Sequence, residues 1–301
     1  MNRVSDALKR ATEEGVYLVT QPAGDGKRRV EEPITADVDV KVNDRIATTI
    51  AESPKQLARS LGKRMQQLIF GWGLGKIKEF PLVTVDVTSP AGDQYRILRE
   101  HIKRICTQEG GGSLAVMSPV KGDGKTMVAV NLAAVMALDF DKQVLLIDAD
   151  LRGPTVHHYF GLNSTPGLAG YLMSEPGTNL MSCVQNTPIR GLKIFPAGNP
   201  TNLASEILAK KRAKSLLTEI SLKLPGHQII VDTPPVLSTP DPLVLADQVD
   251  NIVMVVRAGT TPRNCLSDAM KLLSSDKVKG LILNGAALDR ASKYDYYSHR
   301  T

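Results

Sequence analysis

Short apolar runs of β-forming composition alternate with helix-forming stretches from about residue 81 onward, and this pattern restricts the fold more than any other feature. The helix-forming stretches include TMVAVNLAAVMAL and LASEILAKKRAKSLLTEI. Continuous apolar strands separated by helices indicate a parallel sheet that is covered on both faces. We therefore predict an α/β fold with a mostly parallel, doubly wound sheet over residues 81–290. The predicted strands are LAVMS (114–118), QVLLID (143–148), LKIFPAG (192–198), QIIVDTP (228–234), NIVMVV (251–256) and VKGLILN (278–284).

The segment SPVKGDGKTMVAVNLA directly follows the first predicted strand and opens a helix. A strand, a glycine-bearing loop, Gly-Lys-Thr and a helix form the context of a P-loop, in which backbone N–H groups surround a phosphate. Lys125 is then expected to reach the β- and γ-phosphate oxygens, and the Thr126 hydroxyl to bind Mg²⁺. Pro119 stands where the usual pattern has its first glycine, and a glycine-rich turn without a ligand is the alternative. The predicted nucleotide-binding residues of the loop are Lys121, Gly122, Asp123, Gly124, Lys125, Thr126 and Met127.

Acidic side chains end two further predicted strands. Asp148 ends the run QVLLID and Asp150 follows two residues later, while Asp232 ends the run QIIVD. Each of them alone could be an ordinary capping residue of a β-to-α turn. Parallel strands end at one edge of their sheet, so we expect the three carboxylates to meet the P-loop there. Carboxylates in that place can hold hydrated Mg²⁺ or accept a proton from an attacking hydroxyl.

Residues 1–80 differ from the rest of the chain and are predicted to form a flexible leader. Within the leader, KQLARSLGKRMQQLIFGWGLGKIK carries apolar residues at helical spacing and six basic residues between positions 55 and 78. A basic amphipathic helix of this kind is typical of a membrane-surface anchor. The alternative is a helix that packs its apolar stripe on the main domain.

The net charge and the first residues of the chain indicate which partners and which location to expect for the protein. The net charge of +6 suggests an acidic partner surface, and composition alone does not choose between nucleic acid and anionic lipid. The first residues, MNRVSDALKRATEEG, have no apolar core like that of a signal peptide. The apolar patch LIFGWGLG is too short to span a bilayer. We expect a cytoplasmic protein.

Together, these segments resemble the bacterial protein-tyrosine kinases of polysaccharide synthesis, which are P-loop NTPases with a second, deviant Walker motif. The resemblance covers residues 81–301 and rests on SPVKGDGKT, LLIDADLRGPT, IIVDTPPVLSTPDPLVLADQVD, VVRAGTT and the tyrosine-bearing tail KYDYYSHRT. The segment DQYRILR resembles the helix that joins subunits of this family into a ring, which implies contact roles for Asp93, Arg96 and Arg99. A solvated charged face is the alternative. Arg152 also matches the family pattern and is expected to contact the cofactor.

The resemblance implies an ATP- and Mg²⁺-dependent tyrosine autokinase. We expect Lys125, Asp148, Asp150 and Asp232 to be catalytic, with Asp148 accepting the phenol proton. Mg²⁺ is expected on Thr126, Asp150 and Asp232, mostly through waters. Asn284, at the end of the last predicted strand, is a candidate contact for the adenine base, and an ordinary strand-end asparagine is the alternative.

The C-terminal tail, residues 291–301, carries three tyrosines among polar residues, Tyr294, Tyr296 and Tyr297. An extended chain from Asp289 to Tyr297 spans at most about 28 Å, which suffices to reach a nearby γ-phosphate on the same or a neighbouring subunit. We therefore predict the three tyrosines as autophosphorylation sites. The alternative is that the rings clamp onto a partner or onto the domain itself.

The predicted partners follow the same resemblance. They are a ring of identical subunits, a separate transmembrane activator protein and an anionic membrane surface contacted through residues 55–78, and no nucleic acid is expected. The predicted location is the inner face of the plasma membrane, as a peripheral protein. The competing function is a partition or septum-positioning ATPase, but Val120 stands where those proteins carry their signature lysine. A kinase-like scaffold without transfer activity is a third possibility, although no catalytic residue is missing.

Overall fold

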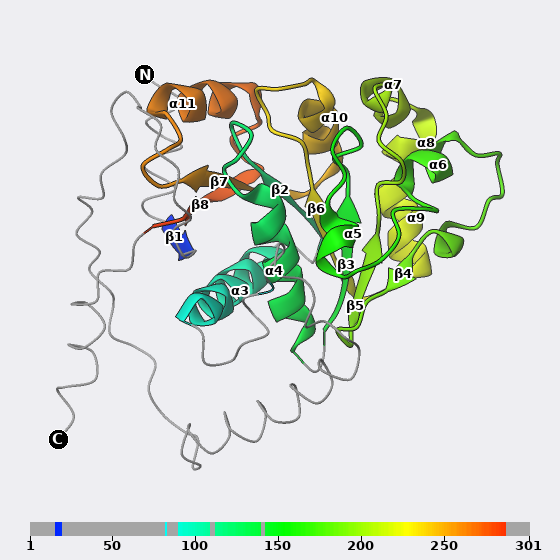
Figure 1. The fold of residues 1–301 in the computed structure, drawn as a ribbon, viewed down its shortest axis with the longest axis horizontal. Helices are drawn as coiled ribbons and strands as arrows, with labels where there is room; N and C mark the ends of the chain where they lie inside the picture. Colours follow the sequence, from blue (N-terminus) through cyan, green and yellow to red (C-terminus); the bar gives the residue numbers. More distant parts are fainter. Residues whose placement is uncertain (1–15, 20–81, 83–89, 109–111, 140–141, 287–301) are drawn as a thin grey trace, which may run out of the picture.

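The protein is described here from a computed structural model that covers residues 16–19, 82, 90–108, 112–139 and 142–286. Its centre is an eight-stranded sheet with the strand order β1-β8-β7-β2-β6-β3-β5-β4 (Figure 1). Neighbouring strands run parallel except for β4, which is antiparallel to β5. The strands are β1 (Val16–Val19), β2 (Ser113–Met117), β3 (Gln143–Asp148), β4 (Gln185–Asn186), β5 (Leu192–Phe195), β6 (His227–Asp232), β7 (Asn251–Arg257) and β8 (Val278–Asn284).

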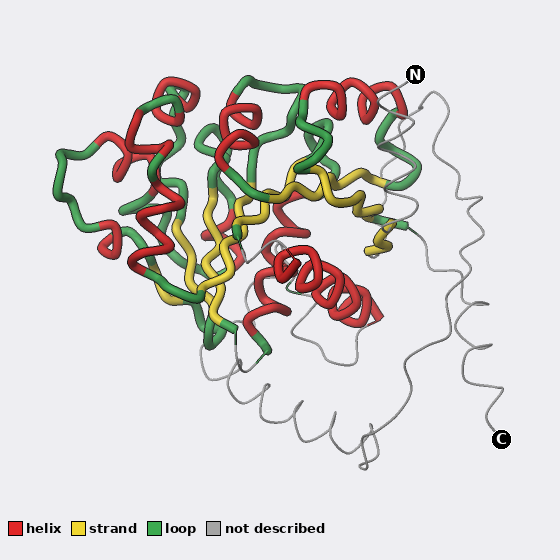
Figure 2. The backbone as a smooth tube through the Cα atoms, turned by 180° about the vertical axis from the view of Figure 1, so that it is seen from behind, coloured by secondary structure: helices red, strands yellow, loops and turns green. Residues whose placement is uncertain are grey.

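Helices cover both faces of this sheet, which confirms the predicted doubly wound α/β fold (Figure 2). They are α3 (Pro90–Gln108), α4 (Lys125–Ala137), α5 (Val156–Tyr159), α6 (Leu168–Met173), α7 (Ala204–Leu208), α8 (Lys211–Lys214), α9 (Leu216–Lys223), α10 (Asp241–Gln248) and α11 (Arg263–Leu272), with a short 3₁₀ helix at Leu180–Ser182. Among the described residues, none of these helices has the length and apolar character needed to cross a bilayer.

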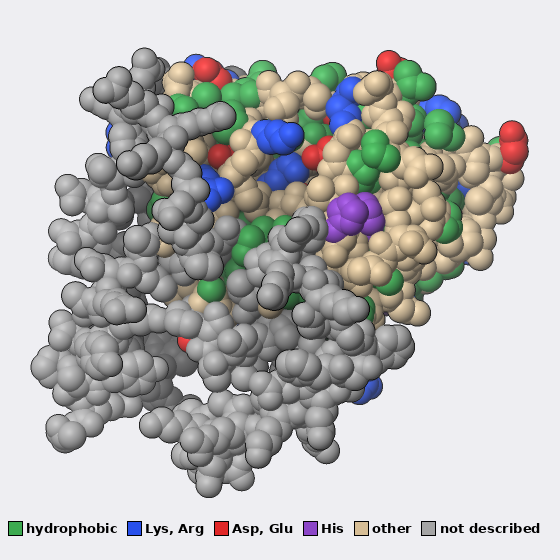
Figure 3. All heavy atoms as spheres, viewed as in Figure 1, with side chains coloured by type: hydrophobic (Ala, Val, Ile, Leu, Met, Phe, Trp, Pro, Cys, Tyr) green, Lys and Arg blue, Asp and Glu red, His purple; other side chains and the backbone are tan. Residues whose placement is uncertain are grey.

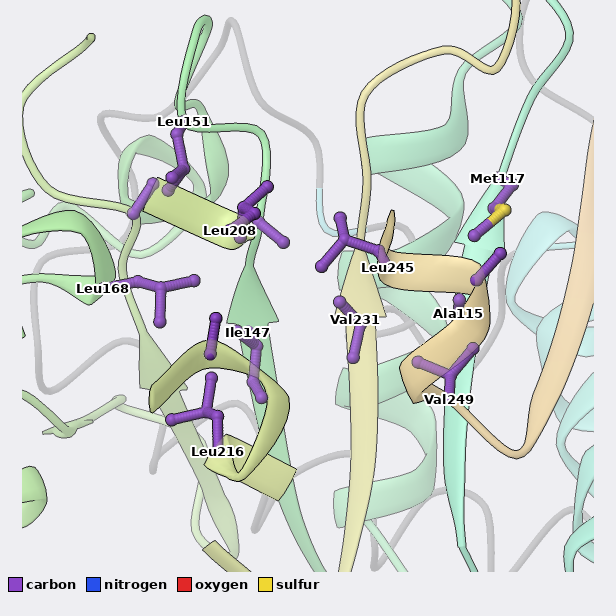
Figure 4. Packing of buried hydrophobic residues seen from close by; sticks show 14 of the residues in the cluster. Ala115, Met117, Ile147, Leu151, Leu168, Leu208, Leu216, Val231, Leu245 and Val249 are labelled. Carbon is purple, nitrogen blue, oxygen red and sulfur yellow. The ribbon is translucent and has the colours of Figure 1, made fainter. Parts of the chain in front are cut away.

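Strand side chains alternate between two hydrophobic clusters, one on each face of the sheet. In β2, Leu114 and Val116 belong to the cluster under α3, α4 and α5, whereas Ala115 and Met117 belong to the opposite cluster. A side-chain period of two produces this division, and burial on both faces explains why the strands read as unbroken apolar runs. On the second face, Leu245 of α10 lies against Val231 of β6 (Figure 4).

Helix α4 is buried along nearly its whole length. It lies between the sheet and α3, and every residue from Met127 to Ala137 is buried. The sequence KTMVAVNLAAVMA accordingly shows no polar face, and its one buried amide, Asn131, donates to the Met127 carbonyl at 3.0 Å. A helix that is apolar all round belongs in the interior. The burial fixes the N-terminus of α4, and with it the P-loop, against the sheet.

One strand of the sheet comes from outside the predicted domain of residues 81–290. Val16–Val19 forms β1 and pairs in parallel with β8, although sequence analysis placed these four residues in the flexible leader. Their composition, VYLV, is β-branched and aromatic, and the exposed edge of β8 supplies the partner strand. The predicted basic helix at 55–78 and the three tail tyrosines lie outside the described residues.

The ends of β7 and β8 and the loop after β7 hold the P-loop in place through polar contacts, some of them buried. The Arg257 guanidinium donates to the Gly122 carbonyl at 3.1 Å, and the Asn284 amide donates to the Asp123 carbonyl at 2.8 Å. The Thr261 hydroxyl donates to the Asp123 carboxylate at 2.7 Å. The same hydroxyl accepts the Arg257 backbone N–H at 2.6 Å. Two strands that follow the loop by more than a hundred residues therefore fix its conformation.

Thr261→Val should destabilise the protein by about 1–3 kcal/mol, because it removes the donor to the buried Asp123 carboxylate and the acceptor of the Arg257 N–H. Thr260→Val is the matched control, since Thr260 is exposed and its hydroxyl reaches only the Ala258 carbonyl, at 3.5 Å. Urea unfolding of both variants measures the difference. Equal unfolding free energies for the two would contradict the assigned role of Thr261.

Candidate functional site

Three strand ends bring the predicted acidic residues to one edge of the sheet. Asp148, the last residue of β3, is the register partner of Asp232, the last residue of β6, and Asp232 also pairs with Val116 of β2. Asp150 follows in the loop after β3, and the P-loop follows β2. Figure 3 shows acidic and basic side chains meeting on this face, beside α5. The expectation that the P-loop and the carboxylates converge is therefore confirmed.

The Lys125 ammonium lies at the centre of the site. It donates to Asp150 at 3.1 Å and to the Thr126 hydroxyl at 3.1 Å, and it stands 3.8 Å from Asp232. Only 12% of the Lys125 side chain is exposed. Burial by itself would lower the pKa of Lys125, but the charges of Asp232 and Asp150 outweigh this effect and raise the pKa. The lysine is therefore a fixed positive charge at neutral pH.

Asp148 is fully buried, and its carboxylate is oriented by backbone amides. One oxygen accepts the Asp150 N–H at 3.2 Å, and the other accepts the N–H groups of Thr155 and Val156 at 3.1 and 3.0 Å. Burial, followed by the charge of Asp232, raises the pKa of Asp148 to about 8. These bonds fix the loop between β3 and α5. The raised pKa means that this carboxylate can take up a proton near neutral pH.

Asp232 supplies the observation that bears on a metal ion. It is completely buried, and both of its carboxylate oxygens lack a hydrogen-bond partner among the described residues. Burial raises the pKa of Asp232 to about 6, against the opposing charge of Lys125. Buried carboxylate oxygens without a hydrogen bond are costly unless a ligand satisfies them.

The donor set fits a hydrated Mg²⁺ rather than a metal enclosed by protein. Within the described segments, no three His, Cys, Asp or Glu side chains converge into a metal cage. Mg²⁺ usually keeps several waters and uses one or two carboxylates together with substrate phosphates. Asp150, Asp232 and the Thr126 hydroxyl all lie within 3.8 Å of the Lys125 ammonium, so the oxygen donors that would hold such an ion are gathered in one place.

The loop before α4 offers its amides to an anion. The first backbone hydrogen bond of α4 runs from Val128 to the Gly124 carbonyl at 3.0 Å, so the amides that precede Val128 lie outside the helical pattern. Gly122 and Gly124 have φ angles of 96° and 92°, which other residues adopt only with strain. The Lys121 side chain is exposed, so its predicted contribution is through its backbone N–H.

Arg152 makes contacts within the protein, and its predicted contact with the cofactor stays a prediction. Its guanidinium donates to Asp241 at 2.8 Å, to the Asn202 carbonyl at 3.1 Å and to the Ser205 hydroxyl at 3.1 Å. Asp241 is fully buried at the start of α10 and also accepts from Ser205. The arginine therefore ties the loop after β3 to α7 and α10. Removing it would leave a buried carboxylate without its partner charge.

Asp123 and Asn284 serve first to shape the P-loop. The Asp123 side chain accepts from the Val120 N–H at 3.2 Å and from Thr261, so only its backbone can serve the predicted nucleotide contact. Burial raises the pKa of Asp123, against the hydrogen bond from Thr261. Asn284 is fully buried and holds the Asp123 carbonyl, whereas its own Oδ1 has no partner among the described residues. Its predicted contact with adenine stays a prediction.

Three residues of the site environment were missed at the sequence level: Arg257, Thr261 and Asp241. Each lies within four residues of a strand end or begins a helix, inside segments that carried the family resemblance. A polar residue just beyond a buried strand was the available signal. This signal does not identify the group that each residue contacts, because these groups lie 89 to 138 positions away in the chain.

The predicted subunit-contact residues lie on the outer part of α3. Asp93 pairs with Arg96 at 2.5 Å, and Arg99 pairs with Glu100 at 2.8 Å. Asp93 and Glu100 are exposed, and the two arginines are partly so. The spacing places a charged surface on α3, and its contact with a neighbouring subunit stays a prediction.

Comparison with known proteins identifies the family. No family model matches the chain. The chain is 32% identical over 243 residues to tyrosine-protein kinase YwqD of Bacillus subtilis (strain 168), a match that covers 80% of this chain and 95% of that protein. It is 30% identical over 214 residues to tyrosine-protein kinase ptk of Acinetobacter johnsonii, covering 70% of this chain and 28% of that longer protein.

The same family appears among solved structures. The kinase domain of Escherichia coli tyrosine kinase ETK matches with a TM-score of 0.63 and 30% identity, over 69% of this chain and 83% of that domain. Both matches favour a tyrosine kinase over the competing prediction of a partition ATPase. With nearly the whole length of one kinase matched, and with the P-loop lysine and the strand-end acids assembled at one edge, this chain belongs to the bacterial tyrosine-protein kinases.

Proposed function

We propose that this protein is an ATP- and Mg²⁺-dependent autokinase that phosphorylates Tyr294, Tyr296 and Tyr297 of its own tail. As a P-loop tyrosine kinase, it binds a nucleotide together with a divalent metal ion. The observation that carries the proposal is the position of the Lys125 ammonium between Asp150 and Asp232, next to the backbone of the P-loop. A transferring phosphoryl group needs positive charge and hydrogen-bond donors at this point.

In the proposed reaction, the phenol oxygen of a tail tyrosine attacks the γ-phosphorus of ATP in line. The new bond joins that oxygen to phosphorus, and the bond from phosphorus to the β,γ-bridging oxygen breaks, so that ADP leaves with the electron pair. Lys125 and the amides preceding Val128 stabilise the charge on the phosphate oxygens. The phenol proton passes to Asp148, whose raised pKa suits it to accept a proton.

Asp150, Asp232 and Thr126 would hold the Mg²⁺, which supplies charge neutralisation between the β- and γ-phosphates. The role of Asp150 in this set is also to orient Lys125, through their 3.1 Å bond. Asp232 contributes the two buried oxygens that lack other partners among the described residues. These groups are largely buried at the edge of the sheet. Their charges therefore act in a low-dielectric environment, where electrostatic interactions are stronger than in water.

We further propose that the substrate tail belongs to a neighbouring subunit in a ring, and that the kinase serves the synthesis or export of an extracellular polysaccharide. The charged outer surface of α3 supports the ring contact. A separate transmembrane activator would switch the kinase on, and residues 55–78 would contact that protein or anionic lipid at the inner face of the plasma membrane. The basic charge of that segment supports this location.

Incubation with labelled ATP and Mg²⁺ should label the tail, and Lys125→Met should reduce the initial rate on the order of 10²–10³-fold, because a preorganised charge at the phosphate is lost. Mass spectrometry of the C-terminal peptide measures the product. Lys142→Met is the control, since Lys142 is exposed and immediately precedes β3, at the other end of that strand. An unchanged rate in Lys125→Met would rule out the proposed site.

The stability of the protein without nucleotide or metal should fall as the pH rises from 6 to 8. The pKa values of Asp232 and Asp148 are raised to about 6 and about 8, so the folded state binds more protons than the unfolded state, whose carboxyls have pKa values near 3.9. The unfolding free energy then decreases with rising pH. Asp148→Asn should flatten this dependence, whereas Asp276→Asn, at an exposed turn, should leave it unchanged.

Urea unfolding in the presence of a chelator, repeated across this pH range, gives the slopes for the three proteins. A slope that is the same in the Asp148→Asn variant as in the parent protein would show that Asp148 is not the buried proton-binding group.

A further inference from the structure

A groove lies on the side of the molecule that carries α6, α8 and α9; Figure 1 shows where these helices lie. It is a groove of about 880 Å³ between the segment that follows α6 and the helices α8 and α9. One wall is formed by Ser174 and residues 176–180, and the other by residues on α8 and α9 and the turns beside them. Neither the kinase site nor the comparisons assign it a role.

Arg212 makes the first wall of the groove rigid. Its guanidinium donates to the carbonyls of Ser174, Glu175 and Thr178 at 2.9, 3.1 and 3.2 Å, and stacks over the ring of Tyr171 with 3.9 Å to the ring centroid. A planar guanidinium with several donors suits this kind of anchoring. The groove therefore keeps its shape without a ligand.

The other cations of the groove are free to bind. Lys210, Lys211 and Lys223 line it, are exposed, and form no ion pair with any residue that the structure describes. The one acidic residue in the lining, Glu219, accepts the Tyr171 hydroxyl at 2.6 Å and is held against the wall. Unpaired lysines around a permanent recess create a local positive potential that attracts an anion.

The floor of the groove is apolar. Leu172 and Leu180 are buried beneath it, and Pro176 lines it beside them. An apolar floor beside a wall that carries three ammonium groups suits a ligand with a flat apolar body and a terminal dianion. Phosphotyrosine has both parts, whereas phosphate alone uses only the rim.

We propose that this groove binds phosphotyrosine, and that its occupant is the phosphorylated tail, residues 291–301, of another copy of the chain. The choice of occupant rests on the proposed autokinase function and on charge. Before phosphorylation, the charges of Lys293 and Arg300 are balanced by Asp295 and the carboxylate of Thr301, so the lysines of the groove do not attract this segment. Each phosphate adds about −1.5 to −2 charges, and three of them give the segment a net negative charge.

Phosphorylation therefore converts a tail without net attraction to the groove into one that the groove attracts. The kinase site and the groove would then handle the same segment before and after the reaction.

The test uses the full chain with Tyr294, Tyr296 and Tyr297 changed to Phe, so that its own tail cannot compete. A fluorescent synthetic peptide of residues 291–301 is titrated by anisotropy, with all three tyrosines phosphorylated or none. We expect binding of the phosphorylated peptide only. Lys211→Glu combined with Lys223→Glu should weaken it at least about tenfold, because charge-assisted contacts are lost.

Lys214→Glu is the matched control, since Lys214 is exposed on the same helix, α8, but does not line the groove. It should change the affinity by less than about twofold. If Lys214→Glu weakens binding as much as the double variant, the attraction is diffuse and the groove is not the site. Equal affinity for the unphosphorylated peptide, or for the same peptide with phosphoserine in place of phosphotyrosine, would also overturn the proposal.

Because the peptide is synthetic, this result does not depend on kinase activity. Binding without autophosphorylation would support the groove and count against the autokinase function. Tail labelling by ATP without groove-dependent peptide binding would leave the kinase function in place and overturn the groove.

Discussion

The buried contact between Lys125, Asp150 and Asp232 organises the working edge of this protein. An ammonium group that is removed from water needs compensating charge, and the two carboxylates provide it at 3.1 and 3.8 Å. The contact also joins three segments that are far apart in the chain: the start of α4, the loop after β3 and the end of β6. It forms only when the sheet has its observed strand order, so the chemistry of the site depends directly on the topology of the fold.

Polar contacts outside the site keep this edge in shape. Arg257, Thr261 and Asn284, at or just after the ends of β7 and β8, form hydrogen bonds to the P-loop. Arg152 connects the loop after β3 to α7 and α10. Most of these side chains are buried or partly buried, so each bond is formed in a medium of low dielectric constant, where leaving a partner unpaired is costly. The loop that receives the nucleotide is therefore preorganised, and this is the property that electrostatic stabilisation of a transferring phosphate requires.

The charge distribution suggests how one segment could be used twice. At the sheet edge the P-loop lysine is paired with carboxylates, whereas lysines without an ion-pair partner among the described residues line the groove at α8 and α9. A tail that gains negative charge on phosphorylation would gain affinity for the groove. The family to which the chain belongs supplies the reaction, and the groove would give its product a place to bind on the same kind of molecule.

Local patterns in the sequence determined the sheet, the P-loop and the strand-end acids, because apolar runs and a glycine-lysine-threonine turn depend on neighbours in the chain. The convergence of Asp148, Asp150 and Asp232 could also be predicted, since parallel strands end at one edge. Only the tertiary structure decided that Arg152 pairs with Asp241, that Asn284 holds the P-loop, and that Val16–Val19 joins the sheet. Each of these depends on a partner 89 to 265 residues away, and a sequence pattern contains the donor or the free edge without saying which distant group will satisfy it.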